Sequence, residues 1–173
     1  VTHFADMLRP DLDDIPEAAL PAGLEVRPVM LEHYRAIWEA EVEAFQDHWG
    51  ASFDEKDYQR FLDEPTFGPA LWRIAWDGDQ VAGQVRSYID SPENEEFGRR
   101  RGYAENISVR RPWRRQGLAR ALLVESLHAL KRRGMEQAAL GVHFENPRQA
   151  LQLYESVGFG VVRMNTTVRK PLD

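Results

Sequence analysis

A short basic turn between a predicted strand and a predicted long helix restricts the fold of this chain more than any other feature. Apolar residues alternate from Tyr103 to Val109, which indicates a β-strand, and from Leu118 they recur at helical spacing up to Gly134. The eight residues that join these segments, 110–117, include four arginines and one glycine. The sequence therefore predicts a strand that turns through a basic loop directly into the N-terminus of a helix.

The start of this helix is suited to bind an anion. The first turn of a helix leaves backbone N–H groups without partners and carries a partial positive charge. Gly117 lets an anion approach that backbone closely. Arg114, Arg115 and Arg120 add full charges around it. We therefore expect a pyrophosphate-binding loop; the alternative is an ordinary solvated helix start, because short glycine motifs also occur by chance.

The charge of the chain is unevenly distributed. Residues 1–98 carry a net charge of −15, residues 99–133 one of +9, and residues 134–173 are balanced, which gives −6 in total. A basic segment inside an acidic protein fits one bound anion better than a nucleic-acid track, which needs a broader basic face. We therefore expect no nucleic-acid partner.

Composition excludes several classes of protein. A length of 173 residues suits one domain with a substantial core. The chain has no cysteine, which excludes disulfides, thiolate metal sites and a cysteine nucleophile, and we expect no metal. No apolar run reaches the ~18 residues of a membrane helix, and no signal-peptide pattern opens the chain. We expect a cytoplasmic protein that does not bind membranes.

The order of the predicted elements indicates the fold class. Strands are predicted at 24–29, 71–76, 81–85, 103–109, 137–142 and 159–168, and helices at 31–45, 54–62, 118–133 and 146–157. Asp77–Gln80 forms the turn of a hairpin, and 91–101 is expected to be a polar loop. We expect an α/β (α+β) fold with a mixed, mainly antiparallel central sheet of six to seven strands and about four flanking helices.

The two ends of the chain resemble each other. Residues 1–9 and 162–170 both read as strands that finish in a basic residue, followed by proline, leucine and aspartate. One interpretation is that 1–9 is the last strand of a preceding, similar domain in a tandem protein; the alternative is a plain N-terminal extension. Residues 10–22, with three prolines and four acids, are expected to be a linker, and 23–173 the main domain.

Two motifs carry a resemblance to a known family. The pattern Arg-x-x-Gly-x-Ala at Arg114, Gly117 and Ala119, behind a strand that ends in Val109, resembles the acyl-CoA signature of the GNAT superfamily of N-acyltransferases. The stretch 146–159, with Asn146, Ala150, Leu153, Tyr154, Gly158 and Phe159, resembles the second signature of that superfamily. The resemblance is close from about residue 103 onward, whereas residues 24–98 match only in the order of elements.

This resemblance implies a function and a set of binding residues. The expected activity is transfer of an acetyl group from acetyl-CoA to a primary amine of a small molecule or peptide, directly in a ternary complex and without a metal. The resemblance assigns acetyl-CoA binding to Ile107, Ser108, Val109, Arg114, Arg115, Gln116, Gly117, Leu118, Ala119, Arg120 and Asn146. Asn146 also suits a helix cap, and both roles are compatible.

Catalytic roles are expected for two residues. Tyr154 matches the position of a tyrosine that protonates the departing thiolate; alternatively it is a core residue with a satisfied hydroxyl. Glu105, on the predicted strand 103–109, is the expected base; the alternative is an exposed strand residue. His143 is titratable but is expected to face solvent. Phe45, His48 and Trp49 are expected to line the acceptor pocket, with core packing as the alternative.

Two other functions are compatible with the sequence. The chain can be a non-catalytic acyl-CoA-binding module in a tandem protein, and a nucleic-acid-binding protein using residues 99–133 is a further alternative. Besides acetyl-CoA and an amine acceptor, the expected partner is a second copy of the chain or a preceding GNAT domain.

Overall fold

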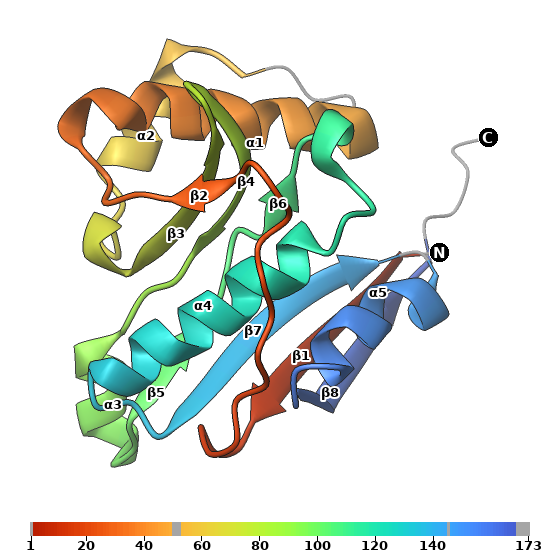
Figure 1. The fold of residues 1–173 in the computed structure, drawn as a ribbon. Coiled ribbons are helices and arrows are strands. Elements are labelled where there is room, and N and C mark those ends of the chain that lie inside the picture. Colours follow the sequence, from red (N-terminus) through yellow and green to blue (C-terminus); the bar gives the residue numbers. More distant parts are fainter. Residues whose placement is uncertain (1, 50–52, 145, 169–173) are drawn as a thin grey trace.

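The computed structural model describes residues 2–49, 53–144 and 146–168, which form two four-stranded sheets with helices on their faces (Figure 1). The first sheet is antiparallel in the order β2-β3-β4-β6, with β2 Glu25–Val26, β3 Trp72–Asp77, β4 Gln80–Arg86 and β6 Ser108–Val109. The second has the order β5-β7-β1-β8, with β5 Arg101–Tyr103, β7 Gln137–Phe144, β1 Thr2–Arg9 and β8 Gly160–Thr167.

Five α-helices accompany these strands in the described part of the chain: α1 Tyr34–Trp49, α2 Glu55–Leu62, α3 Ser91–Phe97, α4 Leu118–Arg132 and α5 Pro147–Glu155. Three short 3₁₀ turns complete them: η1 Leu31–His33, η2 Pro69–Leu71 and η3 Arg111–Trp113. The predicted fold class is confirmed. The strands divide into two sheets, however, where one central sheet was expected.

The division arises within the predicted strand 103–109. β5, which ends at the first residue of this range, pairs in parallel with β7, and β6, at its end, pairs antiparallel with β4. Between them, Asn106 has a φ of 54°, which interrupts the extended backbone. From Tyr103 to Arg110 the segment stays bonded to residues 82–88, but it loses β7 after Ala104, so the two sheets diverge there.

Helix α3 lies where a polar loop was expected. Its local signals are ordinary: the side chain of Asp90 accepts a hydrogen bond from the N–H of Glu93 at 3.1 Å, and Gly98 ends the helix with a φ of 62°. The helix buries none of its residues, so it lacks the apolar periodicity from which helices are predicted.

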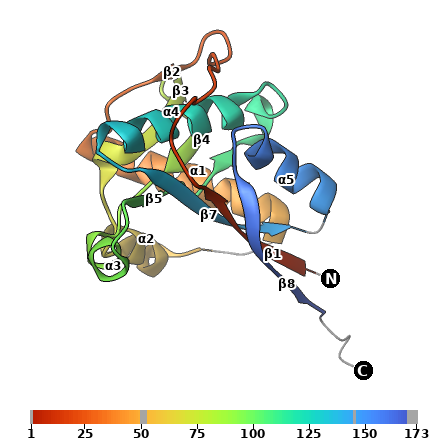
Figure 2. The same ribbon diagram turned by 90° about the horizontal axis from the view of Figure 1, so that it is seen from below.

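Strand β1 lies inside the second sheet, hydrogen-bonded to β7 on one side and to β8 on the other (Figure 2). Ala5 and Met7 on its core face are 0% and 1% exposed. Residues 10–22, which follow it, form no helix or strand, but Leu12 is also buried in the main core. The segment 2–9 is therefore an integral strand of the sheet.

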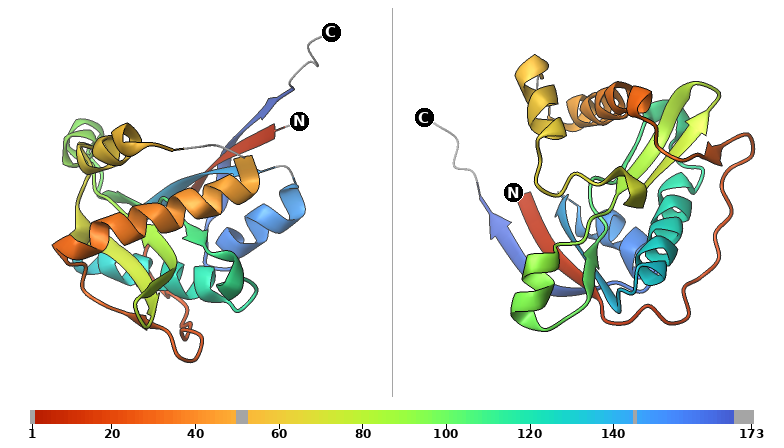
Figure 3. Two further views of the ribbon diagram at one scale, coloured as in Figure 1. Left: turned by 90° about the horizontal axis from the view of Figure 1, so that it is seen from above. Right: turned by 90° about the vertical axis from the view of Figure 1, so that its left-hand side faces the viewer.

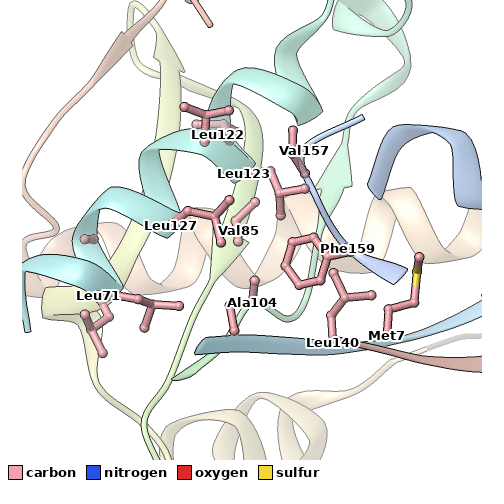
Figure 4. Packing of buried hydrophobic residues seen from close by; sticks show 14 of the residues in the cluster. Met7, Leu71, Val85, Ala104, Leu122, Leu123, Leu127, Leu140, Val157 and Phe159 are labelled. Atoms are coloured by element: carbon pink, nitrogen blue, oxygen red, sulfur yellow. The ribbon is translucent and has the colours of Figure 1, made fainter. Parts of the chain in front are cut away.

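Helix α4 forms the centre of the main core. Leu122, Leu123, Leu127 and Leu130 are completely buried against residues of both sheets, including Val85 and Leu140 (Figure 4). Each such side chain stabilises the fold by about 1.5–3 kcal/mol. Helix α1 covers the opposite face of β3 and β4, over a second cluster that contains Ile37 and Ile74 (Figure 3). This packing holds the N-terminus of α4 beside β6.

Candidate active site

Residues 101–110, which include β5, Glu105 and β6, form the central strand. The hydrogen bonds that join this strand to β7 end at Ala104. The N–H of Ala104 donates to the carbonyl of Ala139 at 3.0 Å, whereas the N–H of Arg110 donates to Ala82 on β4 at 2.9 Å. Successive N–H groups of a strand point to opposite sides, so that of Val109 points away from β4. The N–H of Val109 therefore points towards the side of β7, at a point where β7 has already diverged from the central strand.

Glu105 lies at this point of divergence. One of its carboxylate oxygens accepts a hydrogen bond from the backbone N–H of Gly141 on β7, at 3.1 Å. Burial raises the pKa of Glu105 to about 7; the hydrogen bond from Gly141 opposes this increase, and the nearby charge of Asp6 adds to it. Glu105 is therefore a half-buried carboxyl group that changes its charge near neutral pH.

Tyr154 on α5 faces the same region. It is half-buried and packs against the main core. Burial, and then the charge of Glu105, raise the pKa of its phenol to about 12. The hydroxyl therefore keeps its proton at neutral pH, close enough to Glu105 for the two groups to interact electrostatically.

Two further tyrosines, which belong to no motif in the sequence, lie beside Glu105. Tyr88 and Tyr103 stack with ring centroids 5.0 Å apart and an interplanar angle of 15°. Burial and the charge of Glu105 raise the pKa of Tyr88 to about 12. No local pattern relates Tyr88 to Glu105, because the antiparallel bridge between Tyr88, just after β4, and Tyr103 brings them together.

The basic loop 110–117 is held by contacts on both sides. The guanidinium of Arg110 lies 5.1 Å from the ring centre of Trp113 and forms an ion pair with Glu43. The indole N–H of Trp113 donates to Asp77 at 2.9 Å. Arg114 donates from Nε to the carbonyl of Val109 at 2.9 Å. These contacts place the loop between the end of β6 and the first turn of α4.

The N-terminus of α4 is open. Gly117 is its N-cap residue with a φ of 80°, and no side chain caps the helix. A Cβ added to Gly117 would meet no other atom within 4 Å. Arg115 also has a positive φ, 62°, and 115–117 are exposed, whereas Leu118 is buried and anchors the helix. The first-turn amides, together with the nearby arginines, therefore fit a pyrophosphate group.

The remaining predicted residues lie around this region or outside the described part. Ile107 packs against the main core, Ala119 and Arg120 belong to the first turn of α4, and Asn146 is exposed directly before α5. His143 is exposed, with its ring 4.7 Å from that of Phe4. Phe45 on α1 is 37% exposed. The side chains of His48 and Trp49 lie outside the described residues.

Two absences apply to residues 2–49, 53–144 and 146–168. No group of three or more acidic or histidine side chains there is arranged to hold a metal ion. None of the helices in these segments is long and apolar enough to cross a membrane.

Comparisons with known proteins agree on one family. The model of the "Acetyltransferase (GNAT) family" matches residues 34–159. A mycothiol acetyltransferase from Geodermatophilus obscurus is 31% identical over 150 residues, which are 86% of this chain and 48% of the relative. The chain spans about half the length of such curated relatives.

Solved structures give the same result. The crystal structure of a GCN5-related N-acetyltransferase from Sphaerobacter thermophilus is 28% identical with a TM-score of 0.77, covering 95% of this chain and 50% of that chain. The NatC complex bound to Gag peptide and CoA is 21% identical, with a TM-score of 0.58, over 77% of this chain and 82% of that chain; this likeness concerns the fold alone.

Proposed function

Because the chain belongs to the acetyltransferase (GNAT) family, we propose that it transfers an acetyl group from acetyl-CoA to a primary amine of a small molecule or peptide. The transfer is direct, within a ternary complex. The observation that carries this proposal is the position of Glu105, at the divergence of two strands and on the segment that leads through the basic loop to the open N-terminus of α4.

The basic loop and the first turn of α4 bind the pyrophosphate of the cosubstrate. The amides of 116–120 donate to its oxygens, and Arg114 and Arg115 lie beside it. The uncapped helix and the open space above Gly117 support this assignment. Asn146, before α5, contacts the pantetheine arm. The cosubstrate supplies the thioester whose acyl group is transferred.

Glu105 acts as the general base. An amine attacks only in its neutral form, so a proton has to be removed from the ammonium group. A carboxyl group whose pKa is about 7 is a stronger base than an ordinary glutamate and is still ionised in part at neutral pH. Glu105 takes the proton directly or through one water molecule.

The backbone of Ile107–Val109 stabilises the transition state. The N–H of Val109, which points away from β4, donates to the thioester oxygen as that oxygen gains negative charge. Ile107 and Ser108 hold this segment in place, Ser108 through its pairing with Gln84 on β4.

Tyr154 acts as the general acid. Its phenol is protonated at neutral pH, since its pKa is raised to about 12, and it donates its proton to the departing thiolate. Phe45 on α1 lines the acceptor site.

The function is tested by the release of free CoA thiol from acetyl-CoA in the presence of a panel of primary amines. Transfer that depends on both the amine and Glu105 supports the proposal. CoA binding without cleavage for any amine would instead indicate a non-catalytic binding module.

The chain works beside a second domain of the same fold, or beside a second copy of itself, in the cytoplasm. The greater length of the relatives supports a second domain. Strand β8 supports it too, because it is the outer strand of its sheet and exposes Val162 and Met164.

A further inference from the structure

Strand β1 brings an acidic residue to the proposed active site, although this strand lies outside the residues that the family model matches. The match covers 34–159, whereas β1 spans Thr2–Arg9. In the pairing of β1 with β7, Asp6 lies directly opposite Gly141, the residue whose N–H binds Glu105.

The side chains of Asp6 and Glu105 both lie beside Gly141. A Cβ added to Gly141 would lie 3.9 Å from Oδ1 of Asp6, so the carboxylate of Asp6 stands over the glycine. Because glycine has no side chain, no side chain at position 141 lies between Asp6 and the Gly141 N–H that donates to Glu105. Two carboxyl groups therefore lie on either side of one glycine, from strands nearly 100 residues apart in the sequence.

We infer that the carboxylate of Asp6, presented by β1 across Gly141, keeps Glu105 basic enough to take a proton from the acceptor amine. Asp6 is a positioning residue, because it acts on the substrate only through Glu105. This role rests on the proposed function of Glu105 as the base.

The other charged and titratable groups near Glu105 or Asp6 come from α5, β7, β8 and the segment after β4. Arg163 on β8 is the partner of Asp6 on its other side, and its positive charge opposes that of Asp6. Tyr154 on α5 and Tyr88, two residues after β4, are uncharged at neutral pH. His143 on β7 is exposed. Asp6 is therefore the negative charge that favours the protonated form of Glu105.

The variant Asp6→Asn removes this charge and keeps the size of the side chain. Burial still raises the pKa of Glu105, so only part of the increase is lost. We expect the pKa of Glu105 to fall by about 0.5–1 unit, the effect of one charge at this range in a partly solvated site. The acidic limb of the kcat/KM profile moves to lower pH by the same amount, and the affinity for CoA does not change.

Two variants control the experiment. Asp6→Glu keeps the charge and is expected to retain the wild-type profile. Glu17→Gln removes one negative charge at an exposed position of the segment 10–22 and leaves the titration of Glu105 unchanged. The carboxyl ¹³C resonance of Glu105, followed by NMR, reports the pKa without any need for activity. If Asp6→Asn does not fold, Asp6→Ser tests the same loss of charge.

The outcomes separate this inference from the proposed function. A lower pKa of Glu105 in Asp6→Asn but not in Glu17→Gln supports the inference. An unchanged or higher pKa in a folded Asp6→Asn protein overturns it. Absence of acetyl transfer by the wild type to every amine overturns the proposed function, while the NMR titration still decides whether Asp6 controls Glu105.

Discussion

Glu105 accepts a hydrogen bond from the backbone N–H of Gly141, at 3.1 Å, where the central strand separates from β7. In a continuous sheet, this N–H would bond to a main-chain carbonyl of the neighbouring strand. Here the carboxylate of Glu105 accepts this hydrogen bond instead, so the candidate base lies where the two sheets separate. The geometry of the fold and the chemistry of the site are therefore linked through these two residues.

Gly141 is a residue that we expect to tolerate no side chain. A Cβ there would lie 2.8 Å from Cζ of Phe4, so Gly141→Ala forces the ring of Phe4, or β1 with it, to move. We expect a loss of about 1–3 kcal/mol in the free energy of unfolding, measured by urea denaturation. The double variant Phe4→Leu, Gly141→Ala makes room for the methyl group and should lose less than the sum of the two single variants. Additive losses would show that Phe4 is not the obstacle.

The open helix N-terminus predicts a specific loss of CoA binding. Gly117 and Gly134 lie at the two ends of α4, have φ values of 80° and 84°, and have open space around them. Leucine at either position strains the backbone similarly, but only Gly117→Leu blocks the anion site. Isothermal titration calorimetry should show weaker CoA binding for Gly117→Leu and unchanged binding for Gly134→Leu.

The two arginines of the loop make a related prediction. Replacement of Arg114 or Arg115 by alanine should weaken CoA binding by about 1.5–3 kcal/mol for each charge-assisted hydrogen bond that is lost. The far-UV circular dichroism should stay that of the wild type. Unchanged affinity in both variants would contradict the assignment of the pyrophosphate to this loop.

Glu105 also makes stability depend on pH. Its pKa in the folded state, about 7, lies above the ordinary value of 4.5, so the folded protein binds this proton more tightly than the unfolded chain. The stabilisation of the folded state by this proton is complete below about pH 4.5 and is lost as pH rises through about 7. Glu105→Gln keeps an oxygen that accepts the hydrogen bond from Gly141, but it does not titrate and so lacks this pH-dependent stabilisation. Relative to the wild type, this variant should gain up to about 3 kcal/mol between pH 4.5 and 8, measured by urea denaturation. A difference that does not vary with pH would show that Glu105 titrates normally.

The sequence predicts the local features of this protein better than its long-range ones. The strand, basic turn and helix around Gly117 follow from apolar periodicity and one glycine, which are local signals. Helix α3 was missed because it buries no side chain. The position of β1 between β7 and β8 depends on pairing between distant segments, which periodicity does not specify. For the same reason the sequence did not indicate that Asp6 faces Gly141.

The central claim is that acetyl transfer occurs between Glu105 and Tyr154, and the rate of the chemical step in Tyr154→Phe tests it most directly. This variant keeps the ring and its packing and removes only the hydroxyl. In a rapid-quench measurement at saturating acetyl-CoA, we expect the rate to fall by roughly 10²–10⁴-fold, with almost unchanged acetyl-CoA affinity. Tyr58→Phe, on α2 in the second hydrophobic cluster, is the matched control and should keep the wild-type rate. An undiminished chemical step in Tyr154→Phe would contradict the assignment and leave Tyr154 as a core residue.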